Sequence, residues 1–348
     1  MRNEGVDRFR VGVTRDVRTF DGGFVFAPYD LKALEDAGIE WAFLTEEARP
    51  LRPGLLHGLD GLYHYSAPVT RASLEGVDRL AIIARNGVGL DFIDVAACSE
   101  RGIAVTITPG GITHSMASAA VSLVLAAAHR LRQRDLALRS GDWGPGRFLP
   151  HGTGLRGRTL GVIGYGRIGR EVVRLLEPWA MRVVVTQRTP VTESGVVYAA
   201  LDELLAGADV VVVACPLTEA TRGLLDARRL GLMKPTAILV NVARGAIVDQ
   251  TALVDALRSG RLAGAGLEVV DPEPLPADDP LLGLPNVVGA PHSLGYTDHL
   301  IRGCVEEACA ALLSVAAGRV PANVANPEVL ENPLFTAKLN RFAEGERG

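Results

Sequence analysis

The stretch TLGVIGYGRIG, residues 159–169, decides the fold of this chain. It begins with an apolar run typical of a buried β-strand, and a Gly-x-Gly-x-x-Gly pattern at Gly164, Gly166 and Gly169 ends it. Residues 170–176 then continue as a helical pattern. Glycines at these positions permit a tight turn, close approach of a phosphate to the backbone and close helix–strand packing. The stretch therefore predicts a dinucleotide-binding turn with the pyrophosphate at a helix N-terminus, the alternative being a glycine-rich turn without a ligand.

Apolar strand patterns alternate with helical patterns on both sides of this turn, which predicts parallel sheets covered by helices. We expect an α/β protein of two domains: a Rossmann dinucleotide-binding domain over 113–296, and a flavodoxin-like substrate domain over 1–112 and 297–348. Long helices are expected over 115–139 and 297–317. Strands are expected at 10–13, 41–44, 61–64, 80–83, 103–107, 159–163, 182–186, 209–214, 237–241, 264–269 and 287–289.

Composition excludes several classes of function. The net charge of −4 and a pI of about 6.0 give no basic face for nucleic acid. The apolar stretch 116–128 is too short to span a bilayer, and residues 1–5 show no apolar core of a leader, so we expect no membrane partner. Without any Cys-x2-Cys pair we expect no metal site, and free thiols fit a reducing cytoplasm. The cysteines are Cys98, Cys215, Cys304 and Cys309.

The end of the second Rossmann strand bears on the choice between NAD and NADP. An acidic residue there normally binds the adenosine ribose hydroxyls, but this chain has Gln187 and Arg188. A carboxylate would repel a 2′-phosphate, whereas a guanidinium binds one. The stretch therefore favours NADP over NAD, and the alternative is that Arg188 stacks on adenine or faces solvent.

Three further stretches follow predicted strands: NVARGAIVD at 241–249, LEVVDPEPLP at 267–276 and GAPHSLGYT at 289–297. The carboxyl edge of a parallel sheet is where open α/β folds bind ligands, so Arg244 is expected there. Taken singly, Arg244, Glu273 and His292 also fit a surface ion pair, a solvated loop charge and a packing residue. Their combination with the glycine turn favours a site.

Together these motifs resemble the D-isomer-specific 2-hydroxyacid dehydrogenase family. The resemblance covers most of the chain and includes NGVGLD at 86–91, the glycine turn and CPLT at 215–218 with Thr221. It implies hydride transfer between a nicotinamide and C2 of a small 2-hydroxy or 2-keto acid. Reduction of glyoxylate or hydroxypyruvate is favoured, because cellular NADPH is usually the reductant.

The resemblance also implies roles for individual residues. Arg244 would bind the substrate carboxylate, His292 would be the acid/base, and Glu273 would hold its second ring nitrogen. On the substrate side we expect Asn86, Val88 and Gly89, besides Arg244 and His292. Beyond the three glycines, the expected cofactor contacts are Arg167, Ile168, Gln187, Arg188, Cys215, Pro216, Thr221, Val242, Ala243, Glu268 and Gly295.

The chain departs from the family pattern at Glu268, where members usually carry an Asp that contacts the nicotinamide carboxamide. The longer side chain is expected to change that geometry. A homodimer is expected, since in the family the helix from Ser115 and the segment that follows it form a two-fold contact. The competing function is a nucleotide-sensing, corepressor-like binding protein on the same scaffold, which would not need the complete set of Arg244, Glu273 and His292.

Overall fold

A computed structural model describes residues 8–148, 150–190 and 192–343. The chain forms two compact units. The first unit combines the chain up to Ile112 with the chain from Thr297 onward, and the second unit is Thr113–Tyr296. Residues 1–5, on which the expectation about a leader rests, lie outside the described residues.

The first unit is built on a parallel sheet with strand order β2-β1-β3-β4-β5, the order of flavodoxin-like folds. Its middle strands are buried on both faces, which is why they read as continuous apolar runs. The strands are β1 (Arg10–Val13), β2 (Glu40–Phe43), β3 (Gly61–His64), β4 (Ile82–Arg85) and β5 (Ala104–Thr106).

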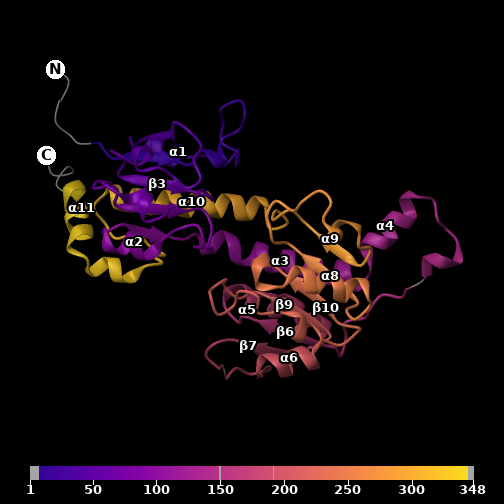
Figure 1. The fold of residues 1–348 in the computed structure, drawn as a ribbon. Coiled ribbons are helices and arrows are strands. Elements are labelled where there is room, and N and C mark those ends of the chain that lie inside the picture. The colour runs from indigo at the N-terminus through magenta and orange to yellow at the C-terminus, as the bar shows by residue number, and fades with distance from the viewer. Residues whose placement is uncertain (1–7, 149, 191, 344–348) are drawn as a thin grey trace, which may run out of the picture. The chain divides into compact units, whose positions relative to one another are not determined.

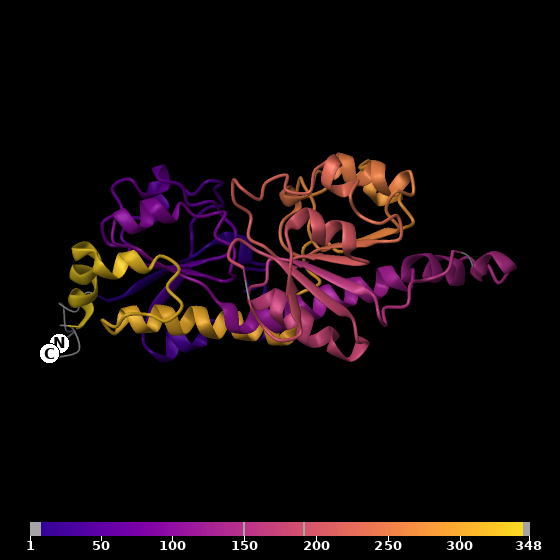
Figure 2. The ribbon, with the colours of Figure 1, turned by 90° about the horizontal axis from the view of Figure 1, so that it is seen from below.

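Helices cover both faces of this sheet (Figure 2). The helices α1 (Lys32–Asp36) and α10 (Asp298–Ala316) pack on one face, and α2 (Val95–Glu100) packs on the other. The C-terminal α11 (Pro333–Ala343) joins the same core as α10. Its Lys338 donates hydrogen bonds to backbone carbonyls of Leu80, Arg101 and Gly102, and so ties the chain end to the sheet.

The second unit has a seven-stranded parallel sheet of order β12-β11-β10-β9-β6-β7-β8. The order reverses between β6 and β9, which is where a Rossmann fold binds its dinucleotide. The strands are β6 (Thr159–Ile163), β7 (Arg182–Thr186), β8 (Val196–Tyr198), β9 (Val210–Val213), β10 (Ile238–Asn241), β11 (Gly264–Leu267) and β12 (Val287–Gly289).

Helices cover both faces of this sheet (Figure 2). On one face α3 (Pro109–Ala128) and α5 (Arg167–Leu176) pack on alternate strand residues. The other face is covered by α6 (Leu201–Gly207), α7 (Ala227–Leu230), α8 (Gln250–Arg258) and α9 (Pro280–Gly283). Although α3 is long and apolar enough for a membrane span, half of it is buried, with Ala117, Ala120, Leu123 and Val124 on the sheet.

The structure corrects the single helix expected over 115–139. Instead α3 begins at Pro109, where a proline suits the first turn, and ends at Ala128. A second helix, α4 (Leu131–Arg139), follows after Arg130, whose φ of 55° lies in the left-handed region. The Arg130 side chain donates a hydrogen bond to the His151 carbonyl, a contact from beyond the helix that local sequence does not reveal.

Residues 131–148 and 150–152, which we call the arm, project away from the sheet of their unit (Figures 1 and 2). Arg132 anchors its base by donating to the carbonyls of Leu282, Leu284 and Val287. The arm exposes large apolar side chains, which are Leu131, Leu136, Leu138, Trp143 and Phe148.

Candidate active site

The glycine turn joins β6 to α5, and contacts within the protein leave no room for a side chain at two of its three glycines. Gly164 has a φ of 95°, and a Cβ there would lie 2.5 Å from the Cys215 amide nitrogen. A Cβ on Gly169 would overlap the Gly164 carbonyl oxygen, so helix and turn touch through backbone alone. By contrast, a Cβ on Gly166 would meet nothing within 4 Å.

The open space at Gly166 fits a dinucleotide. Gly166 is the N-cap of α5, and no side chain of the described residues caps this helix start. The first N–H groups of α5 and its positive dipole end therefore point at the space that the missing side chain leaves, which suits a pyrophosphate. The sequence-predicted neighbours Arg167 and Ile168 occupy the first helical positions there.

The candidate acid/base group lies at the carboxyl edge of the same sheet, after β12. The Nδ1 atom of His292 is 2.9 Å from Oε2 of Glu273. Because an ionised carboxylate only accepts, Nδ1 carries a proton and Nε2 is left for chemistry. Burial raises the pKa of Glu273, but hydrogen bonds from His292 and the Val270 amide, with Arg244 nearby, outweigh it and bring that pKa below its ordinary value.

Arg244 follows β10 and is held against the segment that carries Glu273. Its Nη1 donates to the Ala243 carbonyl at 2.7 Å, and its side chain is partly exposed. A Cβ on the next residue, Gly245, would overlap the Val270 carbonyl, so the two segments meet backbone to backbone. Three ionisable side chains thus follow three neighbouring strands, β10, β11 and β12, at one edge of the sheet.

Known proteins are similar to this chain in both sequence and architecture. A family model described as "D-isomer specific 2-hydroxyacid dehydrogenase, NAD binding domain" matches residues 121–293. The chain is 40% identical to a glyoxylate reductase of Korarchaeum cryptofilum over 270 residues, which covers 76% of this chain and 81% of that one. This chain belongs to the D-isomer specific 2-hydroxyacid dehydrogenase family. It is an NAD(P)-dependent 2-hydroxyacid dehydrogenase.

Solved structures agree with that assignment. A Thermus thermophilus protein superposes with a TM-score of 0.80 at 38% identity, covering 91% of the dehydrogenase and 100% of that chain. The NADPH-dependent glyoxylate/hydroxypyruvate reductase of Sinorhizobium meliloti superposes at 0.79 with 30% identity, covering 92% and 97%. The two-domain α/β fold expected from the sequence is confirmed.

The residues after β7, where the sequence predicts the adenosine contacts, are accessible. Thr186 ends β7 and its carbonyl accepts from the Gly164 amide, which ties the strand to the turn. Gln187 Nε2 donates to the Thr189 carbonyl at 2.8 Å, and Arg188 is exposed. No carboxylate stands at residues 186–190.

The remaining predicted cofactor contacts line the same sheet edge. Cys215 follows β9, and burial raises the pKa of its thiol to about 11. Thr221 Oγ1 donates to the Pro216 carbonyl at 2.7 Å and closes the turn after it. Val242 and Ala243 are buried after β10. Of these residues, Cys215 has its backbone directly against Gly164 of the turn.

Glu268, directly after β11, is almost fully buried, with 1% of its surface exposed. Its Oε1 accepts from the Leu294 amide at 2.9 Å and from the Gly295 amide at 3.4 Å. Burial raises the pKa of Glu268, and these N–H groups offset only part of that effect. The carboxylate therefore supports the loop that carries His292.

The residues expected to bind substrate in the first unit follow β4. Asn86 is buried and its amide donates to the Tyr63 hydroxyl, while Val88 and Gly89 are partly exposed. Gly87 has a φ of 136° and donates its N–H to Thr108 Oγ1 at 2.8 Å. The buried Arg85, which sequence reasoning missed, donates from Nε to the Gly89 carbonyl at 3.0 Å and shapes the loop.

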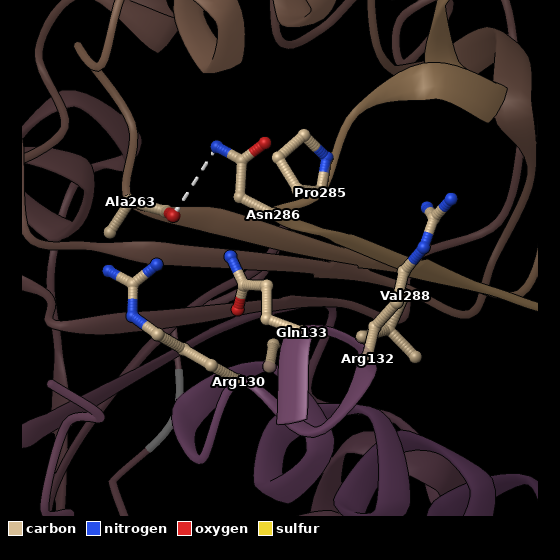
Figure 3. A pocket seen from close by; sticks show the side chains of 8 residues that line it. Arg130, Arg132, Gln133, Ala263, Pro285, Asn286 and Val288 are labelled. Atoms are coloured by element: carbon tan, nitrogen blue, oxygen red, sulfur yellow. Dashed lines mark hydrogen bonds between the residues drawn. The ribbon is translucent and has the colours of Figure 1, made fainter. Parts of the chain in front are cut away.

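A cavity of the second unit lies away from the candidate site (Figure 3). Arg130, Gln133 and Asn286 border it, with Ala263 before β11 and Val288 in β12. Ala263 and Asn286 directly precede β11 and β12, which places the cavity at the amino edge of the sheet, opposite the edge that carries Arg244 and His292. Among the described residues no cluster of three His, Cys, Asp or Glu forms a metal site.

Proposed function

We propose that this dehydrogenase reduces glyoxylate or hydroxypyruvate to the corresponding 2-hydroxy acid with NADPH. The observation that carries the proposal is the His292–Glu273 pair at 2.9 Å, which lies with Arg244 at the same carboxyl edge of the sheet as the glycine turn. Its similarity to glyoxylate reductases at about 40% identity supports the substrate class.

The residues divide the work by their chemistry. The guanidinium of Arg244 offers paired donors to the substrate carboxylate and polarises the neighbouring carbonyl. The nicotinamide, when bound, supplies the hydride to C2. The imidazolium of His292 gives its Nε2 proton to the C2 oxygen and becomes neutral, while Glu273 keeps Nδ1 protonated. We assign further carboxylate contacts to Asn86, Val88 and Gly89.

We propose that the two domains have different roles. We assign the dinucleotide to residues 113–296, and the substrate loop to the domain made of 1–112 and 297–348. The cofactor contacts expected from the sequence remain part of this proposal, including the nicotinamide carboxamide as a partner for Glu268.

The test is a substrate panel read at 340 nm. Glyoxylate, hydroxypyruvate, pyruvate and a branched 2-keto acid are each assayed with NADPH and with NADH. We expect the highest kcat/KM for glyoxylate or hydroxypyruvate. A preference for the branched acid would refute glyoxylate and hydroxypyruvate as the substrates. No turnover of any acid would refute the proposal that this enzyme is a 2-keto acid reductase.

NADPH preference rests on Arg188 and on the missing carboxylate after β7. The S. meliloti relative is described as NADPH-dependent, which supports the same choice. Replacing the guanidinium in Arg188→Ala should lower kcat/KM for NADPH about tenfold, the scale of one charge-assisted contact, and leave that for NADH unchanged. Equal losses with both cofactors would contradict the assignment.

We further propose a cytoplasmic homodimer. The exposed apolar side chains of the arm support an interface with a second copy, because isolated chains rarely expose such a group. Free cysteines, with Cys98, Cys304 and Cys309 buried, fit a reducing compartment. Light scattering should give twice the chain mass for the wild type and the single mass for Leu138→Ser/Trp143→Ser. A wild-type monomer would contradict this.

A further inference from the structure

Two neighbouring strands of the Rossmann sheet, β10 and β11, each carry a buried polar side chain at their carboxyl ends. Asn241 ends β10 and Glu268 follows β11, and each has 1% of its surface exposed. The Glu268 amide donates to the Asn241 carbonyl at 3.0 Å, so the two residues are joined directly. A buried polar group is unfavourable unless it is hydrogen-bonded, and the bonds these two make therefore show what they hold.

Asn241 holds the turn that carries Arg244. Its Oδ1 accepts from the Ala243 amide at 3.0 Å, and its Nδ2 donates to the Arg244 carbonyl at 2.9 Å. A side chain that bonds both an N–H and a C=O of the following residues fixes the backbone of a tight turn. The start of the Arg244 side chain is thereby fixed relative to the strand.

Glu268 holds the loop that carries His292, from two directions. Its carbonyl accepts from the His292 amide at 3.0 Å, and its carboxylate accepts from the amides of Leu294 and Gly295. His292 has a φ of 53°, a conformation that a non-glycine residue adopts only when its surroundings impose it. The contacts at the His292 amide and at the two amides shortly after it supply that constraint.

We propose that Asn241 and Glu268 are positioning residues, Asn241 for Arg244 and Glu268 for His292. The inference rests on the proposed function, in which Arg244 binds the substrate carboxylate and His292 transfers the proton. Loss of each residue therefore has its own kinetic signature. A displaced Arg244 weakens binding of the keto acid, whereas a displaced His292 slows the chemical step.

The experiment compares variants in the full chain. Asn241→Ala should raise KM for the keto acid about tenfold, the scale of one weakened charge-assisted contact, with kcat within about threefold of wild type. Glu268→Ala should lower kcat about 100-fold, the scale of a ~1 Å misplacement, with little change in that KM. Glu268→Gln keeps a carbonyl oxygen at the same reach and should recover most of kcat.

The chain offers a matched control at the opposite edge of the same sheet. Asn286 also ties two loops through Nδ2, to the carbonyls of Leu257 and Ala263. Asn286→Ala should leave kcat and KM as in wild type. Asn241→Asp, which keeps the acceptor and loses the donor, should raise KM and serves if Asn241→Ala does not fold.

Four outcomes would overturn the inference in an active enzyme. The first two are wild-type kinetics in Asn241→Ala and Glu268→Ala, or a lowered kcat together with a raised KM in both. The third is a kcat that Glu268→Gln does not recover. The fourth is a Glu268→Ala defect that fluorescence titration shows to be confined to NADPH affinity. The last outcome would assign Glu268 to the nicotinamide alone. An inactive wild type would instead refute the proposed function, so the two failures are distinguishable.

Discussion

The backbone contact between the Arg244 and Glu273 segments predicts a severe effect of one methyl group. A Cβ in Gly245→Ala would overlap the Val270 carbonyl group and lie 2.7 Å from the Asp271 amide nitrogen. Because non-bonded atoms need roughly 3 Å or more, the two segments must part by about 1 Å. A misplacement of that size costs about 100-fold in rate at a catalytic site, while overpacking costs about 1–3 kcal/mol of stability.

The assay is kcat/KM with the preferred keto acid, together with thermal unfolding. We expect Gly245→Ala to remain folded and to lose about 100-fold in kcat/KM. Gly207→Ala is the control, because a Cβ at the end of α6 meets nothing within 4 Å. Full activity of Gly245→Ala would mean that the spacing of Arg244 and Glu273 does not matter, and would refute the reasoning.

Three other variants each remove a charged group that makes hydrogen bonds in the structure. Glu273→Gln removes the carboxylate that faces His292 Nδ1 and should lower kcat by roughly 100-fold at neutral pH in steady-state assays, whereas an unchanged kcat would exclude Glu273 from the mechanism. Arg174, with His114, lowers the pKa of Glu171 to about 2. Its stabilisation is therefore present above the unfolded value near 4.5 and is lost as pH falls towards 2, so urea unfolding of Glu171→Gln should depend less on pH between those values. Lys338→Met leaves carbonyls of Leu80 and Arg101 without their 2.8 Å and 2.7 Å donor contacts and should cost about 3 kcal/mol in urea unfolding, and wild-type stability would contradict this role.

The strands were the part of the fold that the sequence predicted best. Parallel strands buried on both faces read as short apolar runs, and β6, β7 and β12 have the expected bounds. Edge strand β8 was missed because it has three residues, two of them exposed, and so lacks that run. The helix α11 was also missed, since its place depends on Lys338 reaching carbonyls more than 230 residues away in the sequence.

The motifs of the candidate site could be recognised in the sequence, but the contacts that support them could not. Gly164 directly follows β6 and His292 comes shortly after β12, so the topology fixes their edge of the sheet. The supporting contacts join distant segments: Glu268 reaches Leu294, and Gly245 touches Val270. No local pattern reveals such pairs. Glu268, where the family usually carries an Asp, was the signal in the sequence that pointed to a changed contact after β11.

Deuterium transfer tests the central claim most directly. The enzyme is incubated with glyoxylate and NADPH that carries deuterium at both C4 positions, and the product is analysed by mass spectrometry. Direct hydride transfer predicts glycolate with one deuterium on C2, formed at a rate that His292→Asn reduces strongly without weakening NADPH binding. Unlabelled glycolate, or a labelled product formed equally fast by that variant, would contradict the account.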